Sequence, residues 1–166
     1  MSESVVVSGP GEGRTLLVGG GDCVTYKVRS AETDGAYFCF EVATTPGFGP
    51  PLHKHAYREL FYVLEGTYEF TLERDGRMET INGEAGTAVA VPPEVPHTFK
   101  NAGNAPARLL FVHQPAALEP FFEEFGVPIA RPGEIPEGAE APDFGAMAAA
   151  LERNGVDVIV SSEGIR

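Results

Sequence analysis

The sequence is short of basic residues and of long apolar runs. Lysine and arginine together number 12 against 24 aspartates and glutamates, which gives a formal net charge of −12. A surface of this sign repels nucleic-acid phosphates and anionic lipids, so we expect neither nucleic acid nor a membrane as a partner. No apolar stretch reaches the ~18 residues of a spanning helix, which argues against a transmembrane segment.

Cysteine is also scarce, with Cys23 and Cys39 the only two. The opening residues, Met-Ser-Glu-Ser-Val, lack the basic and apolar regions of a signal peptide, so we expect a cytoplasmic protein with reduced thiols. A hairpin across the turn at residues 33–35 would place Cys39 opposite Lys27 and Cys23 well along the strand. That separation is too large for a disulfide bond.

What the sequence does contain is a series of short runs rich in Val, Phe, Tyr and Thr, several of them alternating polar and apolar residues. The clearest runs cover residues 23–29, 36–43, 59–64, 67–73, 78–81, 87–91, 97–100 and 107–113. Turn pairs such as Asp75-Gly76 and Asn82-Gly83 separate them. Many short strands at this spacing predict one all-β domain, a sandwich or a barrel, over about residues 15–115.

The pattern changes after Pro115. Two apolar stripes there have helical spacing: Leu118, Phe121, Phe122 and Phe125, then Phe144, Met147, Ala148 and Leu151. Asp143 is the predicted N-cap of the second helix, and Asn154-Gly155 is its predicted end. Residues 156–160 are predicted to form a last strand. We therefore expect a barrel over residues 1–116, N-terminal strands included, with a helical tail over 117–166 packed on it.

Three of the four histidines fall in two short segments, with His53 and His55 in residues 47–66 and His97 in residues 86–101. Side chains two apart on a strand face the same side, and Glu59 keeps the parity of the two histidines. Proline-rich residues 92–96 can turn the chain back and bring His97 to the same point. Three imidazoles and a carboxylate suit six-coordinate Fe(II), Mn(II), Ni(II) or Co(II), and zinc is possible too.

The first of these segments matches the pattern G-x5-H-x-H-x3-E-x6-G at every fixed position. The second matches G-x5-P-x-G-x2-H-x3-N except that Glu94 replaces a glycine. The chain thus resembles the cupin superfamily, which implies an antiparallel jelly-roll β-barrel with short C-terminal helices here. The resemblance also implies a metal ion on His53, His55, Glu59 and His97.

Several further residues can be interpreted from these patterns. Pro93-Glu94 favours a type I turn without positive φ, so we expect an altered turn beside an intact site. Arg58 has the opposite parity to the ligands and should face outward, while His113 is interpreted as a core or rim residue. Residues Phe61, Val63 and Phe99 share the ligands' parity and are predicted to line the pocket.

The chain also resembles the quercetinase-like monocupins of bacteria, in Gly-Pro-Pro-Leu-His-Lys-His, Phe-Tyr-Val-Leu-Glu-Gly and the helical Phe-Phe-Glu-Glu-Phe-Gly. This resemblance implies a metal-dependent dioxygenase that opens a flavonol-like or enediol small molecule. We expect Glu59 to act in it as general base. Two alternatives stay open: a redox-silent isomerase, cyclase or lyase, and a cupin that binds a metal or small molecule without turnover.

The sequence leaves the substrate and the native metal open. We also expect a homodimer, because exposed N-terminal residues such as Val5, Val6 and Val7 would need a partner edge.

Overall fold

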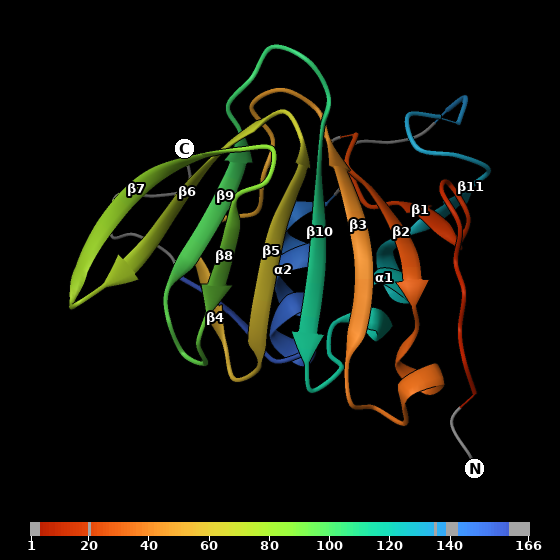
Figure 1. Cartoon of the computed structure of the whole chain (residues 1–166), viewed down its shortest axis with the longest axis horizontal. Coiled ribbons are helices and arrows are strands. Elements are labelled where there is room, and N and C mark those ends of the chain that lie inside the picture. The colour runs from red at the N-terminus through yellow and green to blue at the C-terminus, as the bar shows by residue number, and fades with distance from the viewer. Residues whose placement is uncertain (1–3, 20, 135, 139–142, 160–166) are drawn as a thin grey trace.

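The computed structural model describes residues 4–19, 21–134, 136–138 and 143–159. Two antiparallel sheets face each other, with the helices of the C-terminal tail behind them (Figure 1). In spatial order, the seven-stranded sheet contains β11 (Val127–Ile129), β1 (Thr15–Leu17), β2 (Cys23–Val28), β3 (Phe38–Thr44), β10 (Ala107–Gln114), β5 (Arg58–Glu65) and β8 (Ala88–Val91). The five-stranded sheet contains β12 (Val156–Val158), β4 (His53–His55), β9 (His97–Asn101), β6 (Thr67–Arg74) and β7 (Arg77–Glu84).

This architecture confirms the predicted all-β jelly-roll fold. Each run predicted as a strand corresponds to a strand, and the short β4 adds one that carries His53 and His55. The strand expected at Val5, Val6 and Val7 is wrong, because residues 4–14 contain no strand. Val5 and Val7 are exposed, as expected, at 93% and 85%. A 3-10 turn, η1 (Ser30–Thr33), joins β2 to β3.

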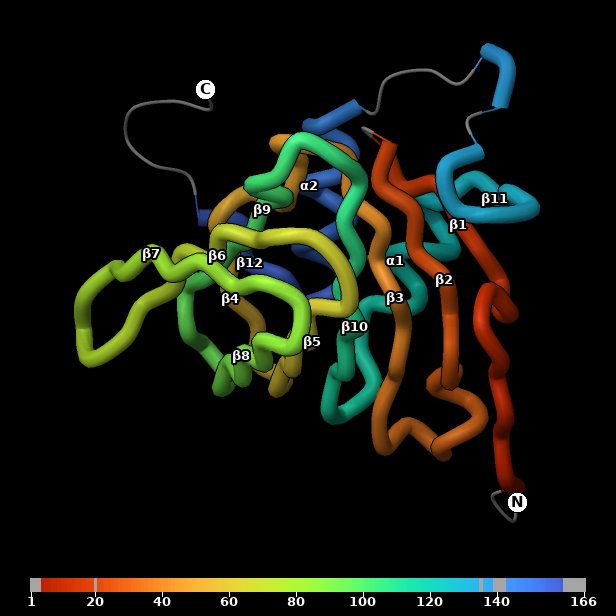
Figure 2. The backbone as a smooth tube through the Cα atoms, turned by 45° about the horizontal axis from the view of Figure 1, so that its top comes forward, coloured from red at the N-terminus to blue at the C-terminus, as the bar shows by residue number. Residues whose placement is uncertain are grey.

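Both predicted helices are present, as α1 (Glu119–Phe125) and α2 (Phe144–Arg153). The Asp143 side chain accepts a hydrogen bond of 3.0 Å from the Ala146 amide, which is the predicted N-cap. The tail also extends both sheets, since β11 pairs with β1 and β12 pairs with β4 (Figure 2). Of the predicted last strand, residues 156–158 form β12, and residue 160 lies outside the described residues.

Aromatic side chains fill the space between the sheets, because inward positions alternate along strands that are rich in phenylalanine. Phe40 stacks between Phe38 and Phe111, with ring centroids 4.6 and 4.8 Å apart. From α1, Phe122 packs edge-on against Phe40 at 5.2 Å. The helix therefore covers the same core that the strands enclose.

The two cysteines are free thiols in the structure, as predicted. Cys39 pairs with Val28 instead of Lys27, because the register shifts between Tyr26 and Val28. Neither of the helices among the described residues has the length and apolar character that crossing a bilayer requires.

Candidate metal centre

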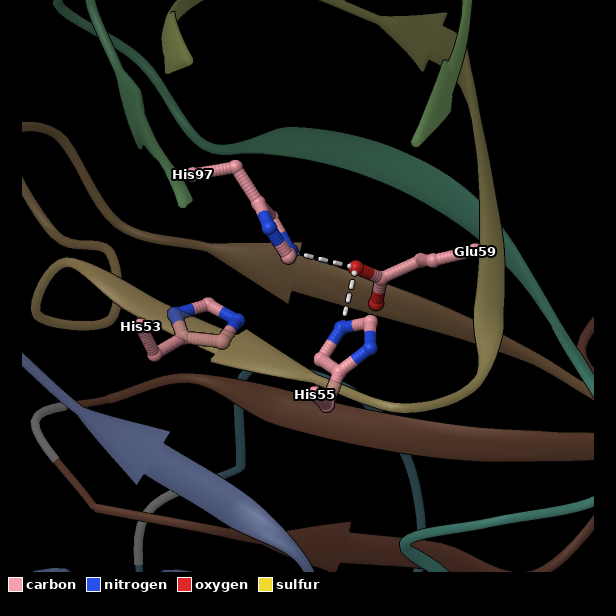
Figure 3. A group of neighbouring side chains, drawn as sticks. All are labelled: His53, His55, Glu59 and His97. Carbon is pink, nitrogen blue, oxygen red and sulfur yellow. Dashed lines mark hydrogen bonds and ion pairs between the residues drawn. The ribbon is translucent and has the colours of Figure 1, made fainter. Parts of the chain in front are cut away.

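The two histidine-containing segments meet at one point inside the barrel. His53 and His55 come from β4, Glu59 from β5 and His97 from β9, and one ligand atom of each lies within 4.8 Å of the others. In Figure 3 the three imidazole rings and the carboxylate point toward a common centre. Strand pairing produces this convergence, because His53 is the residue of β4 that lies opposite His97 of β9.

Backbone carbonyls fix the orientation of each ring. The Nδ1 atoms of His53, His55 and His97 lie 2.8, 2.9 and 2.7 Å from the carbonyl oxygens of Pro51, Tyr57 and Val95. A carbonyl can only accept, so each Nδ1 carries a hydrogen and each Nε2 is left to face the centre of the cluster. A second nitrogen held in this way is typical of metal-binding histidines.

Glu59 supplies the oxygen of the cluster. Its Oε2 lies 2.7 Å from Nε2 of His97 and 3.1 Å from Nε2 of His55. Burial on its own raises the pKa of this carboxyl, but the contacts with His113, His55 and His97 outweigh it and hold the pKa well below its usual range. Glu59 is therefore an anion in a buried place, 6% exposed.

The donor set fits a divalent metal ion. The Nε2 atoms of His55 and His97 lie so close to Oε2 of Glu59 that a proton or a cation must lie between them. Ligand bonds of ~2.0–2.2 Å at right angles would put neighbouring donor atoms ~3.0 Å apart, close to the 2.7 and 3.1 Å between Oε2 of Glu59 and the Nε2 atoms of His97 and His55. Burial lowers the pKa of His53 to about 4, which keeps that ring neutral, as a metal ligand must be.

Interpretation of the sequence missed the role of His113. Its Nε2 lies 2.7 Å from Oε1 of Glu59, and its Nδ1 donates to the carbonyl of Ala117 at 3.0 Å. The ring is fully buried. His113 contacts Oε1 of Glu59, whereas Oε2 faces His55 and His97. The contact with His113 therefore fixes the direction in which the Glu59 carboxylate points.

Tyr57 is a second residue that no motif indicated. Its ring stacks on His55 with centroids 3.7 Å apart and planes 2° apart. Its Oη is buried and has no hydrogen-bond partner among the described residues. Burial, followed by the charge of Glu59, raises the pKa of this phenol, so the hydroxyl keeps its hydrogen.

The turn before His97 differs from the prediction. Glu94 has a φ of 65°, so the chain keeps the left-handed turn for which the motif has glycine, and the expected type I turn without positive φ is wrong. The reason is tertiary, because the Glu94 amide donates to the carbonyl of His55 at 2.7 Å. The Glu94 carboxylate also lies 3.6 Å from Nζ of Lys54. These contacts tie the turn to β4.

Other motif positions act on the backbone. Gly66 has a φ of 84°, and a Cβ there would lie 2.5 Å from that of Ala107, so only glycine fits. Asn101 is buried, and its side chain donates to the carbonyls of Thr44 and Ala105. Arg58 is exposed, as its parity predicts.

A cavity of about 210 Å³ opens onto the cluster, lined by His53, Tyr57 and Glu59 among others. Of the three residues predicted to line a pocket, Phe99 does so. Phe61 and Val63 lie instead in the hydrophobic core. The Phe61 ring packs 4.8 Å from that of Phe111 and 5.5 Å from that of Phe70. Their parity correctly predicted that these side chains point inward. Part of the barrel interior is filled by packed core side chains, however, and these two lie there.

The family model of the cupin domain matches residues 40–113 of the chain. Two curated relatives match shorter stretches. The uncharacterised protein MJ1618 of Methanocaldococcus jannaschii is 35% identical over 65 residues, which are 39% of this chain and 49% of that protein. Polyketide synthase CurC of Streptomyces cyaneus is 38% identical over 76 residues, 45% of this chain and 47% of that protein. The matched part thus spans about half the length of each relative.

Solved structures resemble the fold. An RmlC-like cupin from Shewanella frigidimarina superposes with a TM-score of 0.57 at 22% identity, covering 73% of this chain and 99% of that one. Oxalate decarboxylase from Bacillus subtilis superposes with a TM-score of 0.54 at 24% identity, covering 61% of this chain and 28% of that one. These structures show the jelly-roll fold, and over residues 40–113 the chain is similar to the cupin domain family.

Proposed function

We propose that the chain is a metal-dependent dioxygenase that opens the ring of a flavonol-like or enediol small molecule. The observation that carries the proposal is the placement of three imidazoles and a carboxylate at one end of a cavity with mostly apolar walls. The resemblance of its motifs to those of quercetinase-like monocupins supports the same substrate class. Apolar walls exclude water, which strengthens the electrostatic interactions at the cluster.

His53, His55, Glu59 and His97 would hold the ion. When bound, a divalent ion supplies a Lewis acid that lowers the pKa of a substrate hydroxyl. Fe, Mn, Ni and Co are compatible with this donor set, as is zinc. The ring-opening reaction breaks carbon–carbon bonds of the substrate and places both atoms of dioxygen in the products.

The side chains of this chain would handle the proton and the substrate's orientation. Glu59 accepts the hydroxyl proton as general base, and His113, at 2.7 Å, keeps its carboxylate directed at the cluster. Tyr57 lines the same cavity with a hydroxyl that has no partner among the described residues, so it can donate to a substrate oxygen. Phe40, Phe99 and Phe111 provide flat apolar walls for an aromatic ring.

A second candidate is a redox-silent cyclase, isomerase or lyase that acts on an enolisable ring at the same site. The similarity to the Streptomyces polyketide synthase favours this candidate, because polyketide chains are rich in enolisable carbonyls. A cupin that binds its ligand without turnover is the third. All three share the metal cluster and differ in what happens to the ligand.

The test measures metal content, oxygen uptake and substrate loss together on the full chain, loaded in turn with Fe(II), Mn(II), Co(II), Ni(II) and Zn(II). The substrate panel contains a flavonol, a catechol and an enediol. We expect oxygen uptake that needs the metal, is lost in His55→Ala and is retained in Arg58→Ala, a control at an exposed neighbour of Glu59. Substrate loss without oxygen uptake would favour the redox-silent enzyme. Substrate binding without substrate loss and without oxygen uptake would favour the non-catalytic cupin.

A further inference from the structure

The cavity carries one polar side chain that the metal cluster does not use. Its lining side chains are apolar or glycine except for four, namely His53, Tyr57, Glu59 and Asp22. The first three adjoin the metal cluster. Asp22 belongs to the turn between β1 and β2, at another part of the wall. The cavity therefore has a second polar point.

A glycine-rich turn places this carboxyl. Gly19 and Gly21 have φ values of 96° and 94°, and the turn is closed by hydrogen bonds between the backbones of Val18, Gly19 and Asp22. These bonds involve only the main chain of Asp22. The side chain takes no part in closing the turn, and its carboxyl accepts a hydrogen bond from the Thr45 backbone.

The Asp22 carboxyl is incompletely satisfied. Its Oδ1 is buried without a hydrogen-bond partner among the described residues. Burial raises its pKa to about 7, and a hydrogen bond from the Thr45 backbone opposes the rise only in part. Leaving a buried carboxyl oxygen unpaired is unfavourable, so a ligand that pairs with it gains affinity.

Strand register gives the separation of the two polar points. Glu59 lies opposite His113, which lies opposite Phe38 of β3. Asp22 directly precedes Cys23, which lies opposite Ala43 of the same strand. Asp22 is therefore level with Thr44, six residues along β3 from Phe38. At ~3.3 Å per residue the backbone levels are about 20 Å apart, and the side chains shorten the gap.

The cavity is also small, because its volume of about 210 Å³ is below the ~300–1,000 Å³ of common ligand pockets. Phe40, Val42 and Phe99 line it, along with Phe121 and Phe122 of α1. These walls favour a flat, elongated and mainly apolar ligand over a compact polar one.

We propose that Asp22 is a specificity-determining residue that binds a hydroxyl group at the remote end of an elongated aromatic ligand, whose other end meets the metal cluster. The proposal rests on the proposed function for the location of the ligand's chelating end. It adds a requirement that the metal cluster does not impose, namely a hydrogen-bond donor on the ring farthest from the metal.

Three probes test this in the full, metal-loaded chain without oxygen, so that binding is measured without turnover. The first is a flavonol with an unsubstituted remote phenyl ring, the second carries a para hydroxyl on that ring, and the third has this hydroxyl as its methyl ether. Isothermal titration gives the Kd of each. Because the hydroxyl supplies the partner that the buried Oδ1 of Asp22 lacks, we expect the hydroxylated probe to bind about tenfold or more tightly than the other two.

The variants separate recognition from folding. Asp22→Ala should abolish the preference for the hydroxylated probe and leave the Kd of the unsubstituted one unchanged. Asp22→Asn, which can still accept from the Thr45 amide, should reduce the preference. Asp75→Asn, at an exposed turn between β6 and β7, is the matched control and should bind all three probes as the wild type does.

Equal binding of the three probes by the wild type would overturn the proposal, as would a failure to bind any of them. An equal loss of affinity for all probes in both Asp22 variants would also overturn it, because the residue would then only support the turn. Oxygen uptake measured on the same samples in air tests the proposed function separately. A preserved preference without oxygen uptake would reject the dioxygenase and keep the role of Asp22.

Discussion

Replacing His113 by phenylalanine tests how Glu59 is positioned. The ring is fully buried and joins Oε1 of Glu59 at 2.7 Å to the carbonyl of Ala117 at 3.0 Å. His113→Phe keeps an aromatic ring against Phe40, which packs edge-on at 5.0 Å, but removes both polar contacts. The variant therefore isolates the hydrogen-bonding role of this residue from its packing role.

Two effects of different size should follow. Each buried polar atom that loses its partner costs about 1–3 kcal/mol, so the loss of two contacts should lower the free energy of unfolding of the metal-free protein by about 2–6 kcal/mol. Glu59 should also lose its fixed direction, and substitutions behind a metal ligand typically weaken metal binding about 10–100-fold. His113→Gln retains an amide N–H that can reach Glu59 and should recover most of the metal affinity.

The assay compares urea unfolding of the metal-free variants with the Kd for Co(II), obtained by competition with a chelator, and with the Co(II) absorption spectrum. Phe38→Leu is the control. The Phe38 ring packs 6.4 Å from the His113 ring, and its replacement removes no polar contact. It should lower stability and leave Kd and spectrum unchanged. If His113→Phe behaves like this control, the residue only fills the core and the reasoning about Glu59 is refuted.

The remaining predictions concern the base, a buried acid, a strained turn and assembly. Glu59→Gln, refilled with metal to full occupancy, should lose turnover by about 10²–10⁴-fold, since an amide is no base at neutral pH; near wild-type activity would show that another group takes the proton. The folded-state pKa of Asp22 is raised from 3.8 to about 7, so wild-type stability should fall as pH rises through that interval. The loss of unfolding free energy is at most about 4 kcal/mol, and thermal melts of Asp22→Asn should not show it. If the stability of wild type and variant depends on pH in the same way, the raised pKa is contradicted. Glu94→Gly should match or exceed wild-type stability by up to about 1 kcal/mol in melting experiments, because glycine adopts the φ of 65° without strain; a clear loss would mean that the contact with Lys54 outweighs it. We propose a homodimer, for which light scattering should give twice the 17.7 kDa of one chain, and a monomer at micromolar concentration would reject it.

Much of the fold could be predicted from local patterns. Alternation along the strands predicted which side chains face inward, because each strand exposes its two faces with a period of two. The stripes at 118–125 and 144–151 predicted both helices, and Asp143 marked the start of the second. The spacing of His53 and His55 placed two donors on one face of β4, and Glu59, at matching parity, joins them from β5. These features depend on residues close together in the chain.

The features that the sequence did not indicate depend on contacts between distant residues. His113 reaches Glu59 only because β10 pairs with β5 in a register that sets these two residues opposite each other. The Glu94 turn keeps its left-handed backbone because a hydrogen bond to His55 holds it there.

The division of the barrel interior into core and cavity was likewise decided by the tertiary structure. Phe61 and Phe99 have the same parity, yet only Phe99 lines the cavity. Asp22 follows three glycines that indicate only a turn, and it lines a mainly apolar cavity because strands and helices from the rest of the chain surround it. Local sequence determines which way a side chain points, whereas the packing of distant segments determines what it meets there.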